Sequence, residues 1–107
     1  MNQVMETAKA AERALLVGTR LSDVSKWEIE DSLDELARLA DTAGAEVVER
    51  VIQHRERPDA AYFIGRGKAE EIAALYKALD ATLVIFDADL SPAQTRNLEA
   101  AIGGRVI

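Results

Sequence analysis

Short apolar runs, several of them rich in β-branched residues, alternate with helix-like segments along most of this 107-residue chain. The clearest run is Thr82–Phe86, whose nearly continuous apolarity is typical of a parallel strand covered on both faces. Three further runs have strand character: residues 14–18, 46–52 and 105–107. Because strands that alternate with helices are joined by right-handed crossovers, the pattern predicts an α/β fold. We expect a three-layer βαβαβαβ arrangement around a mostly parallel four-stranded sheet.

The first helix is predicted to begin at Ser32. Ser32 and Glu35 have the spacing of a capping box, in which each residue binds the backbone N–H of the other. Gly44 stands where a glycine commonly ends a helix. The segment before this helix, residues 22–31, is interpreted as a polar connection that contains the only tryptophan, Trp27.

Two more helices follow in the second half of the chain. One is predicted to start near Gly67, after a turn that contains Gly65 and Gly67. The other has an N-terminal signature in Ser91-Pro92-Ala93-Gln94 and a stop signal at Gly103. All three predicted helices thus lie between strand-like runs.

Composition places the chain among single-domain globular proteins. Its length suits one domain, and its 49% hydrophobic and 30% charged residues are ordinary values for a folded chain. It has no cysteine and one histidine, which is too few for disulfides or a typical zinc site. No apolar run approaches the ~20 residues that span a bilayer. We predict a flexible lead-in at residues 1–12, a folded domain at 13–107, no membrane span and a cytoplasmic location.

Charge is distributed unevenly along the chain. The net charge is −6, yet the segment Arg50–Lys68 carries five basic and two acidic residues. Two interpretations stay open for this segment. It is either a solvated loop with scattered charge or a patch that contacts nucleic acid phosphates.

The stretch Ile64-Gly65-Arg66-Gly67-Lys68 raises the question of a phosphate-binding loop. A P-loop requires G-x-x-x-x-G-K-[ST], but Tyr62 stands at the first glycine and Ala69 at the hydroxyl position. The dinucleotide pattern G-x-G-x-x-G fails because Glu70 stands at its third glycine. A helix N-terminus still attracts anions, so nucleotide binding through Gly65–Lys68 remains the alternative function.

Asp87 and Asp89 directly follow the Thr82–Phe86 strand, where α/β folds place their sites. This position resembles that of the phosphorylated aspartate in receiver domains. A receiver also needs an acidic pair after its first strand, and Gly18-Thr19-Arg20 stands there instead. We therefore interpret the two aspartates as residues of the loop before the third helix, and we predict no catalytic residue and no metal site.

Several motifs in the right order resemble the N-terminal domain of HflX-type GTPases. The resemblance covers about residues 13–107. The matching segments are Ser32-Leu33, Glu35–Ala40, Thr42–Ala45, Arg57–Asp59, Ile64–Glu71, Leu83–Asp87, Leu90–Gln94 and Arg96–Glu99. Thr95 departs from the family pattern, which usually has a leucine there, and so does Gly104, where an apolar residue is usual. Neither departure touches the glycine motif.

The resemblance implies a function that composition does not reveal. HflX-type proteins are ribosome-associated GTPases that bind the large subunit and split stalled ribosomes. Their GTP and Mg²⁺ site lies in a separate, later G domain, joined through a helical linker. By this resemblance the chain is the leading domain, contacts ribosomal RNA (rRNA) and does not hydrolyse GTP alone. Its own G domain and linker would be further partners.

Some members are described as binding ATP through this region. A purely structural domain that positions the G domain is the third possibility.

The resemblance, together with the local charge, nominates residues for RNA contact. The basic candidates would bind rRNA phosphates, and an aromatic one would stack on a base. The candidate residues are Arg50, Arg55, Arg57, Tyr62, Arg66 and Lys68, beside the glycines Gly65 and Gly67.

Overall fold

The structure, a computed structural model, describes residues 11–107. The predicted lead-in at residues 1–12 therefore falls almost entirely outside the described residues; Ala11 and Glu12 are exposed and precede the first strand. Seven elements follow in strict alternation. They are β1 (Arg13–Arg20), α2 (Lys26–Thr42), β2 (Glu46–His54), α3 (Arg66–Ala78), β3 (Leu83–Phe86), α4 (Pro92–Ile102) and β4 (Arg105–Val106).

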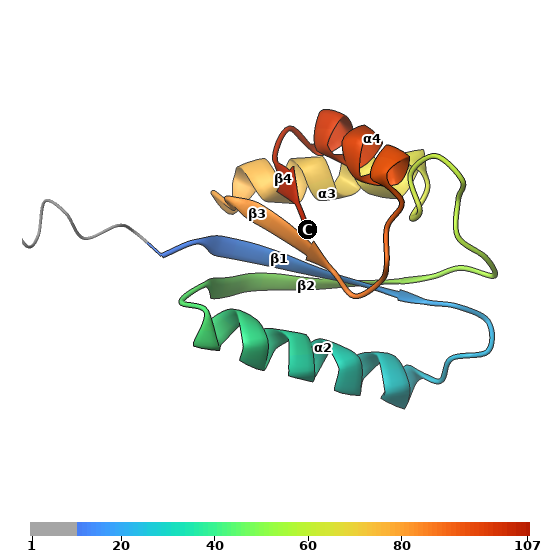
Figure 1. The fold of residues 1–107 in the computed structure, drawn as a ribbon, viewed down its shortest axis with the longest axis horizontal. Helices are drawn as coiled ribbons and strands as arrows, with labels where there is room; N and C mark the ends of the chain where they lie inside the picture. Colours follow the sequence, from blue (N-terminus) through green and yellow to red (C-terminus); the bar gives the residue numbers. More distant parts are fainter. Residues whose placement is uncertain (1–10) are drawn as a thin grey trace, which may run out of the picture.

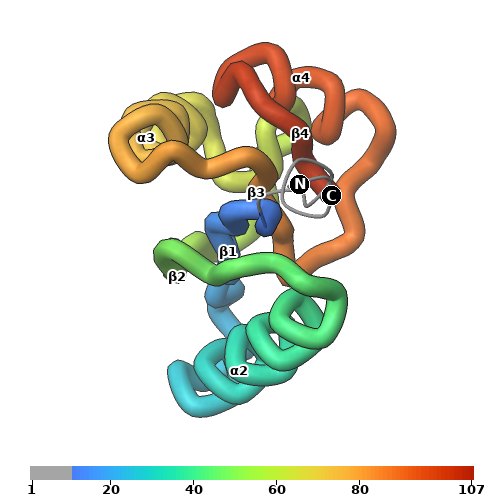
Figure 2. Tube along the Cα trace, turned by 90° about the vertical axis from the view of Figure 1, so that its left-hand side faces the viewer, coloured from blue at the N-terminus to red at the C-terminus, as the bar shows by residue number. Residues whose placement is uncertain are grey.

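The four strands form one parallel sheet in the order β2-β1-β3-β4, which confirms the predicted fold class. Figure 1 shows α2 on one face of the sheet and α3 with α4 on the other. Figure 2 shows the same three layers from the side. Because the chain first moves from β1 to β2 and then returns past β1 to β3, right-handed crossovers require α2 and α3 on opposite faces.

Strand β1 lies at the centre of the core. Its side chains alternate between the two faces, as a pleated strand requires. Leu15 and Val17 belong to the larger apolar cluster under α3 and α4, and Ala14 and Leu16 to the smaller cluster under α2. All four are fully buried, which explains why the run reads as continuously apolar.

Helix α2 begins at Lys26, so the prediction of a polar connection at residues 22–31 and a start at Ser32 was wrong. The N-cap is Ser25, whose hydroxyl accepts the Glu28 N–H while Glu28 binds the Ser25 N–H. Ser25-x-x-Glu28 matches the same capping pattern seven residues earlier. Ile29 and Leu33 are both buried at i, i+4, so the apolar face continues through the segment that was interpreted as a loop.

The other helix boundaries follow the sequence signals. Gly44 and Gly103 have φ values of +90° and +81°, as expected for glycines that follow helices. Ser91 is the N-cap of α4 and a proline lies in its first turn, as predicted, and Ser91 and Gln94 additionally form a capping box. These termini fix where the chain leaves each helix and enters the next strand.

Candidate functional site

The basic and glycine-containing segment forms the β2–α3 loop, residues 55–65, which leaves the carboxyl end of β2 and leads into α3. Carboxyl ends of parallel strands share one edge of the sheet, and α/β folds place their binding sites along that edge. In Figure 1 the loop extends beyond the sheet and returns beside α4. Its position thus agrees with a recognition role.

The loop is held in one conformation by its own hydrogen bonds. The Asp59 carboxylate accepts the backbone N–H groups of Ala61 and Tyr62 at 3.0 and 2.7 Å. Asp59 and Phe63 also exchange two backbone hydrogen bonds of 2.8 and 3.0 Å. Phe63 has a φ of +61°, which bulky residues seldom adopt and which packing must therefore maintain.

Two side chains of α4 attach the loop to the helical layer. The Gln94 Nε2 donates to the Asp59 carbonyl at 2.9 Å, and the Asn97 Nδ2 donates to the Ala61 carbonyl at 3.0 Å. Sequence reasoning identified Gln94 only as a helix-capping residue and missed Asn97. The available signal was their spacing, since positions i and i+3 of a helix lie on the same face.

Arg55 acts inside the loop. Its guanidinium donates to the backbone carbonyls of Arg57 and Ile64 at 3.0 and 3.3 Å. Gly65, the N-cap of α3, has a φ of +84°, and a Cβ built there would lie 2.7 Å from the Arg55 Nη1. The expected turn function is therefore confirmed for Gly65. For Gly67 it was wrong, because Gly67 lies inside the first turn of α3 and has no positive φ.

The remaining candidates differ in availability. The guanidinium of Arg57 is exposed and has no ion pair or hydrogen-bond partner within residues 11–107. Arg66 forms a 3.4 Å ion pair with Glu70, but the two side chains are 76% and 65% exposed, so water competes for both partners. Lys68 is bound to Glu71 at 2.6 Å and is only 20% exposed. Arg57 and Arg66 are therefore the cations most accessible to a ligand.

Arg50 lies apart from the loop. Its side chain forms a 2.6 Å ion pair with Asp34 of α2, and its backbone pairs with β1 in the middle of the edge strand β2. The interpretation of Arg50–Lys68 as one basic patch was therefore wrong for Arg50. The linear charge count ignored the two-residue period of a strand, which directs alternate side chains to opposite faces.

Tyr62 is half-buried and borders a groove between α3 and α4 with a volume of about 360 Å³. Arg66 and Glu70 line one side of this groove, and Asn97 lines another. The groove combines an aromatic ring, a guanidinium, a carboxylate and an amide. This set of groups can stack on a planar base and form hydrogen bonds with its edge.

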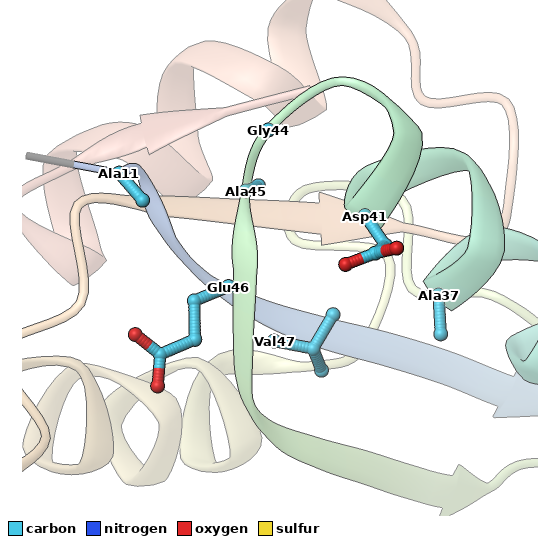
Figure 3. A pocket seen from close by; sticks show the side chains of 7 residues that line it. All are labelled: Ala11, Ala37, Asp41, Gly44, Ala45, Glu46 and Val47. Atoms are coloured by element: carbon cyan, nitrogen blue, oxygen red, sulfur yellow. The ribbon is translucent and has the colours of Figure 1, made fainter.

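A second hollow, of about 480 Å³, lies at the opposite edge of the sheet, where α2 leads into β2. Figure 3 shows that Asp41 and Ala37 border it from α2, while Glu46 points away from both. Its lining consists mainly of alanine, glycine and valine. It offers few groups for chemistry and none of the candidate residues.

Residues 11–107 contain neither a metal-binding cluster nor a membrane-spanning helix. No group of three or more histidine or acidic side chains in this range is arranged to hold a metal ion. Within the same range, no helix is long and apolar enough to cross a membrane.

Comparison with known proteins identifies the family. A family model described as GTP-binding GTPase N-terminal matches residues 30–107. A protein named GTPase HflX from Lacrimispora saccharolytica is 43% identical over 107 residues, which cover 100% of this chain and 25% of the relative. GTPase HflX of Escherichia coli is 43% identical over 98 residues, covering 92% of this chain and 22% of the relative.

The chain therefore belongs to the GTP-binding GTPase N-terminal family, as an HflX-type N-terminal domain, and the resemblance seen in its motifs is confirmed. It spans about a quarter of the length of the curated relatives it matches. The described elements thus correspond to the leading domain of such a GTPase.

Proposed function

We propose that this domain binds rRNA of the large ribosomal subunit, as the leading part of a GTPase that splits or rescues stalled ribosomes. One observation carries the proposal most directly. The β2–α3 loop is fixed from within by Asp59 and from outside by α4, yet it leaves the guanidinium of Arg57 accessible. A preorganised loop loses little conformational entropy on binding, so its cations can position a phosphate backbone at low cost.

The groove beside Tyr62 adds a second kind of contact. Arg66 lines this groove, and its exposed ion pair with Glu70 is readily exchanged for a phosphate or base contact. RNA recognition commonly combines phosphate contacts with stacking of an unpaired base on an aromatic ring. Tyr62 and Arg66 supply both within one groove.

The whole GTPase would perform its chemistry elsewhere. We infer that GTP and Mg²⁺ bind in the later G domain, that a helical linker connects it to this domain, and that the protein acts in the cytoplasm with ribosomes. Lys68 is held by Glu71 at the start of α3, which favours a structural role for the Gly65–Lys68 motif over nucleotide binding. Titration calorimetry of this chain with ATP and GTP tests that assignment. A saturable heat with either nucleotide would favour the nucleotide-binding alternative.

Co-sedimentation with purified large subunits at low and moderate salt tests rRNA binding. We expect binding that weakens steeply with salt, because neutralised phosphates release counterions. The double variant Arg57→Glu/Arg66→Glu should abolish binding at moderate salt while the thermal unfolding of the domain stays nearly unchanged.

A matched control is available on α2. Lys26→Glu/Arg38→Glu makes the same change in net charge, and each of its two exposed cations pairs with a neighbouring glutamate, as Arg66 does. Lys26 is the first residue of α2, as Arg66 is of α3. The control should bind like the parent. Equal losses in both variants would indicate a nonspecific charge effect, and unchanged binding in both would leave the domain a structural role in positioning the G domain.

A further inference from the structure

A crevice of about 300 Å³ opens at the carboxyl ends of β1 and β3. These neighbouring strands are where the chain direction across the sheet reverses, since α2 leads to β2 on one side and α4 leads to β4 on the other. Open α/β sheets bind ligands at this reversal, because the connections to the two sides diverge and leave a gap. We call this cavity the switch-point crevice. It is separate from the groove that Tyr62 borders.

The polar side chains of the switch-point crevice are all oxygen groups. Thr19 comes from β1, Glu28 and Ser32 from α2, and Asp87 from the end of β3. Carboxylates only accept hydrogen bonds, and hydroxyls can accept them. Among residues 11–107, no lysine, arginine, histidine or amide side chain lines the crevice. A ligand that fits must therefore bring donors, and two carboxylates favour one that carries positive charge.

Thr19 gives an independent sign that the crevice lacks a hydrogen-bonding ligand. Its side chain is 92% buried, being 8% exposed, and its Oγ1 has no hydrogen-bond partner among the residues that the structure describes. Buried hydroxyls are nearly always paired, because an unpaired one loses its hydration without compensation. Thr19 lines the crevice, and its Oγ1 lies just behind the wall, closed to solvent, so a donor that enters the crevice and displaces that wall would supply the missing partner.

Phe63, the residue with a φ of +61°, forms another wall of the crevice. Leu21 and Val24 add apolar surface beside it. Backbone conformations of this kind in bulky residues cluster at ligand sites, where the surrounding packing maintains the unfavourable φ value. Such walls suit an aliphatic stem. They do not suit a hydrated metal ion, which needs polar groups on all sides.

We propose that the switch-point crevice binds a guanidinium group carried on an aliphatic stem. The stem lies against Leu21, Val24 and Phe63. The planar head donates to Asp87, to the Glu28 oxygen that does not accept the Ser25 N–H, and to the Thr19 hydroxyl once the wall in front of it has moved. A guanidinium has five donors in a fixed fork and is more weakly hydrated than an ammonium, so it suits a partly apolar site with several acceptors.

The test is an NMR titration of the 107-residue chain with n-butylguanidinium, at constant ionic strength. We expect saturable shifts of the backbone amides around Thr19, Ser32 and Asp87. n-Butylammonium, with the same stem and charge, should bind several-fold more weakly. Absence of saturable shifts at these residues would overturn the proposal. So would equal affinity for the two cations, because the argument depends on the planar fork.

Two variants locate the binding groups. Asp87→Asn removes one charge from the crevice and should weaken n-butylguanidinium binding about tenfold, as expected for loss of a charged hydrogen bond. Asp89→Asn, two residues further along the same loop and outside the lining, is the control and should bind normally. If both variants bind like the parent, the cation does not occupy this crevice.

Thr19→Val separates binding from folding. Valine has nearly the shape of threonine and removes the unpaired hydroxyl, so this variant should unfold at a higher temperature than the parent. Its affinity for n-butylguanidinium should nevertheless fall. A variant that is more stable and binds unchanged would show that Thr19 takes no part, and the proposal in this form would fail.

The same chemistry could reach the crevice from two sources, and two probes distinguish them. Free L-arginine represents a small metabolite, and the blocked tripeptide acetyl-Gly-Arg-Gly-amide represents an arginine of a partner protein. Tighter binding of the tripeptide supports an arginine presented by a polypeptide, and tighter binding of free arginine supports a metabolite. If neither binds while n-butylguanidinium does, arginine is not the natural carrier of the guanidinium, and the proposal fails for both sources. None of these outcomes depends on rRNA binding.

Discussion

Gly65 and Gly67 stand two residues apart, and the structure predicts opposite effects when each is replaced by alanine. Gly65 has φ +84° and ψ 155°, a backbone region that is almost restricted to glycine. Alanine in that region costs about 1–3 kcal/mol of backbone strain. Its Cβ would also lie 2.7 Å from the Arg55 Nη1, which must then move and give up its bond to Ile64. A lost hydrogen bond of this kind adds about 1–2 kcal/mol.

Gly65→Ala is therefore expected to destabilise the domain by about 2–5 kcal/mol. For a domain of this size each kcal/mol lowers the melting temperature by roughly 4–8 °C, so the shift should be plain in a thermal or urea melt. Gly67→Ala is the control. Gly67 lies in α3, has no positive φ and has no atom within 4 Å of a built Cβ, so alanine should stabilise the domain by about 0.5–1 kcal/mol.

The critical result is that the two substitutions change the stability of the domain in opposite directions. If both variants lose stability equally, then Gly67 does not lie in a regular helical turn and the start of α3 is misplaced. If Gly65→Ala is neutral, the Arg55 bridge does not hold the loop. In that case the preorganisation on which the proposed RNA contact depends would rest on Asp59 and the bonds from α4 alone.

Two other predictions concern the elements around the loop. Ser25→Ala should cost about 1 kcal/mol in a urea melt because it removes the N-cap of α2, whereas Ser32→Ala, inside the helix, should be close to neutral. If Ser32→Ala instead cost more stability than Ser25→Ala, the helix would start at Ser32. Asn97→Ala breaks the bond to the Ala61 carbonyl, so hydrogen exchange of the β2–α3 loop should accelerate while global stability falls by only about 1 kcal/mol. Unchanged exchange in that variant would mean that α4 does not restrain the loop.

The order and type of the elements could be predicted from sequence because each has its own local signal. β1 and β3 are continuous apolar runs, and α4 has a serine cap, a proline and a terminal glycine. The start of α2 could not be decided by such signals. Two capping boxes, at Ser25 and Ser32, fit the same rule, and burial of Ile29 under the first turns selects the earlier one.

The candidate site could be predicted only in part. Counting charges along the chain located the β2–α3 loop but could not separate exposed cations from paired ones. Arg50 and Lys68 are committed to Asp34 and Glu71, and Arg55 to backbone carbonyls. The bonds from α4 to the loop join residues about 35 positions apart, and no local pattern reveals contacts of that kind.

If the domain binds RNA as proposed, the acidic net charge of the chain would help to orient it. Helix α2 carries six acidic and two basic residues, and it covers the face of the sheet opposite α3 and α4. A polyanion is repelled from α2 and attracted to the accessible Arg57 and Arg66, so the acidic helix should discourage binding in the wrong orientation.

This reasoning makes a last prediction. Asp31→Lys/Asp41→Lys replaces two exposed acids of α2 that take part in no ion pair among residues 11–107. The variant should bind unrelated duplex RNA more tightly and with a steeper dependence on salt, because α2 then also attracts phosphates. Its preference for large subunits over that duplex should fall, as competition co-sedimentation would show. If the preference is unchanged, the acidic helix does not set the orientation, and the shape of the loop and groove alone would account for it.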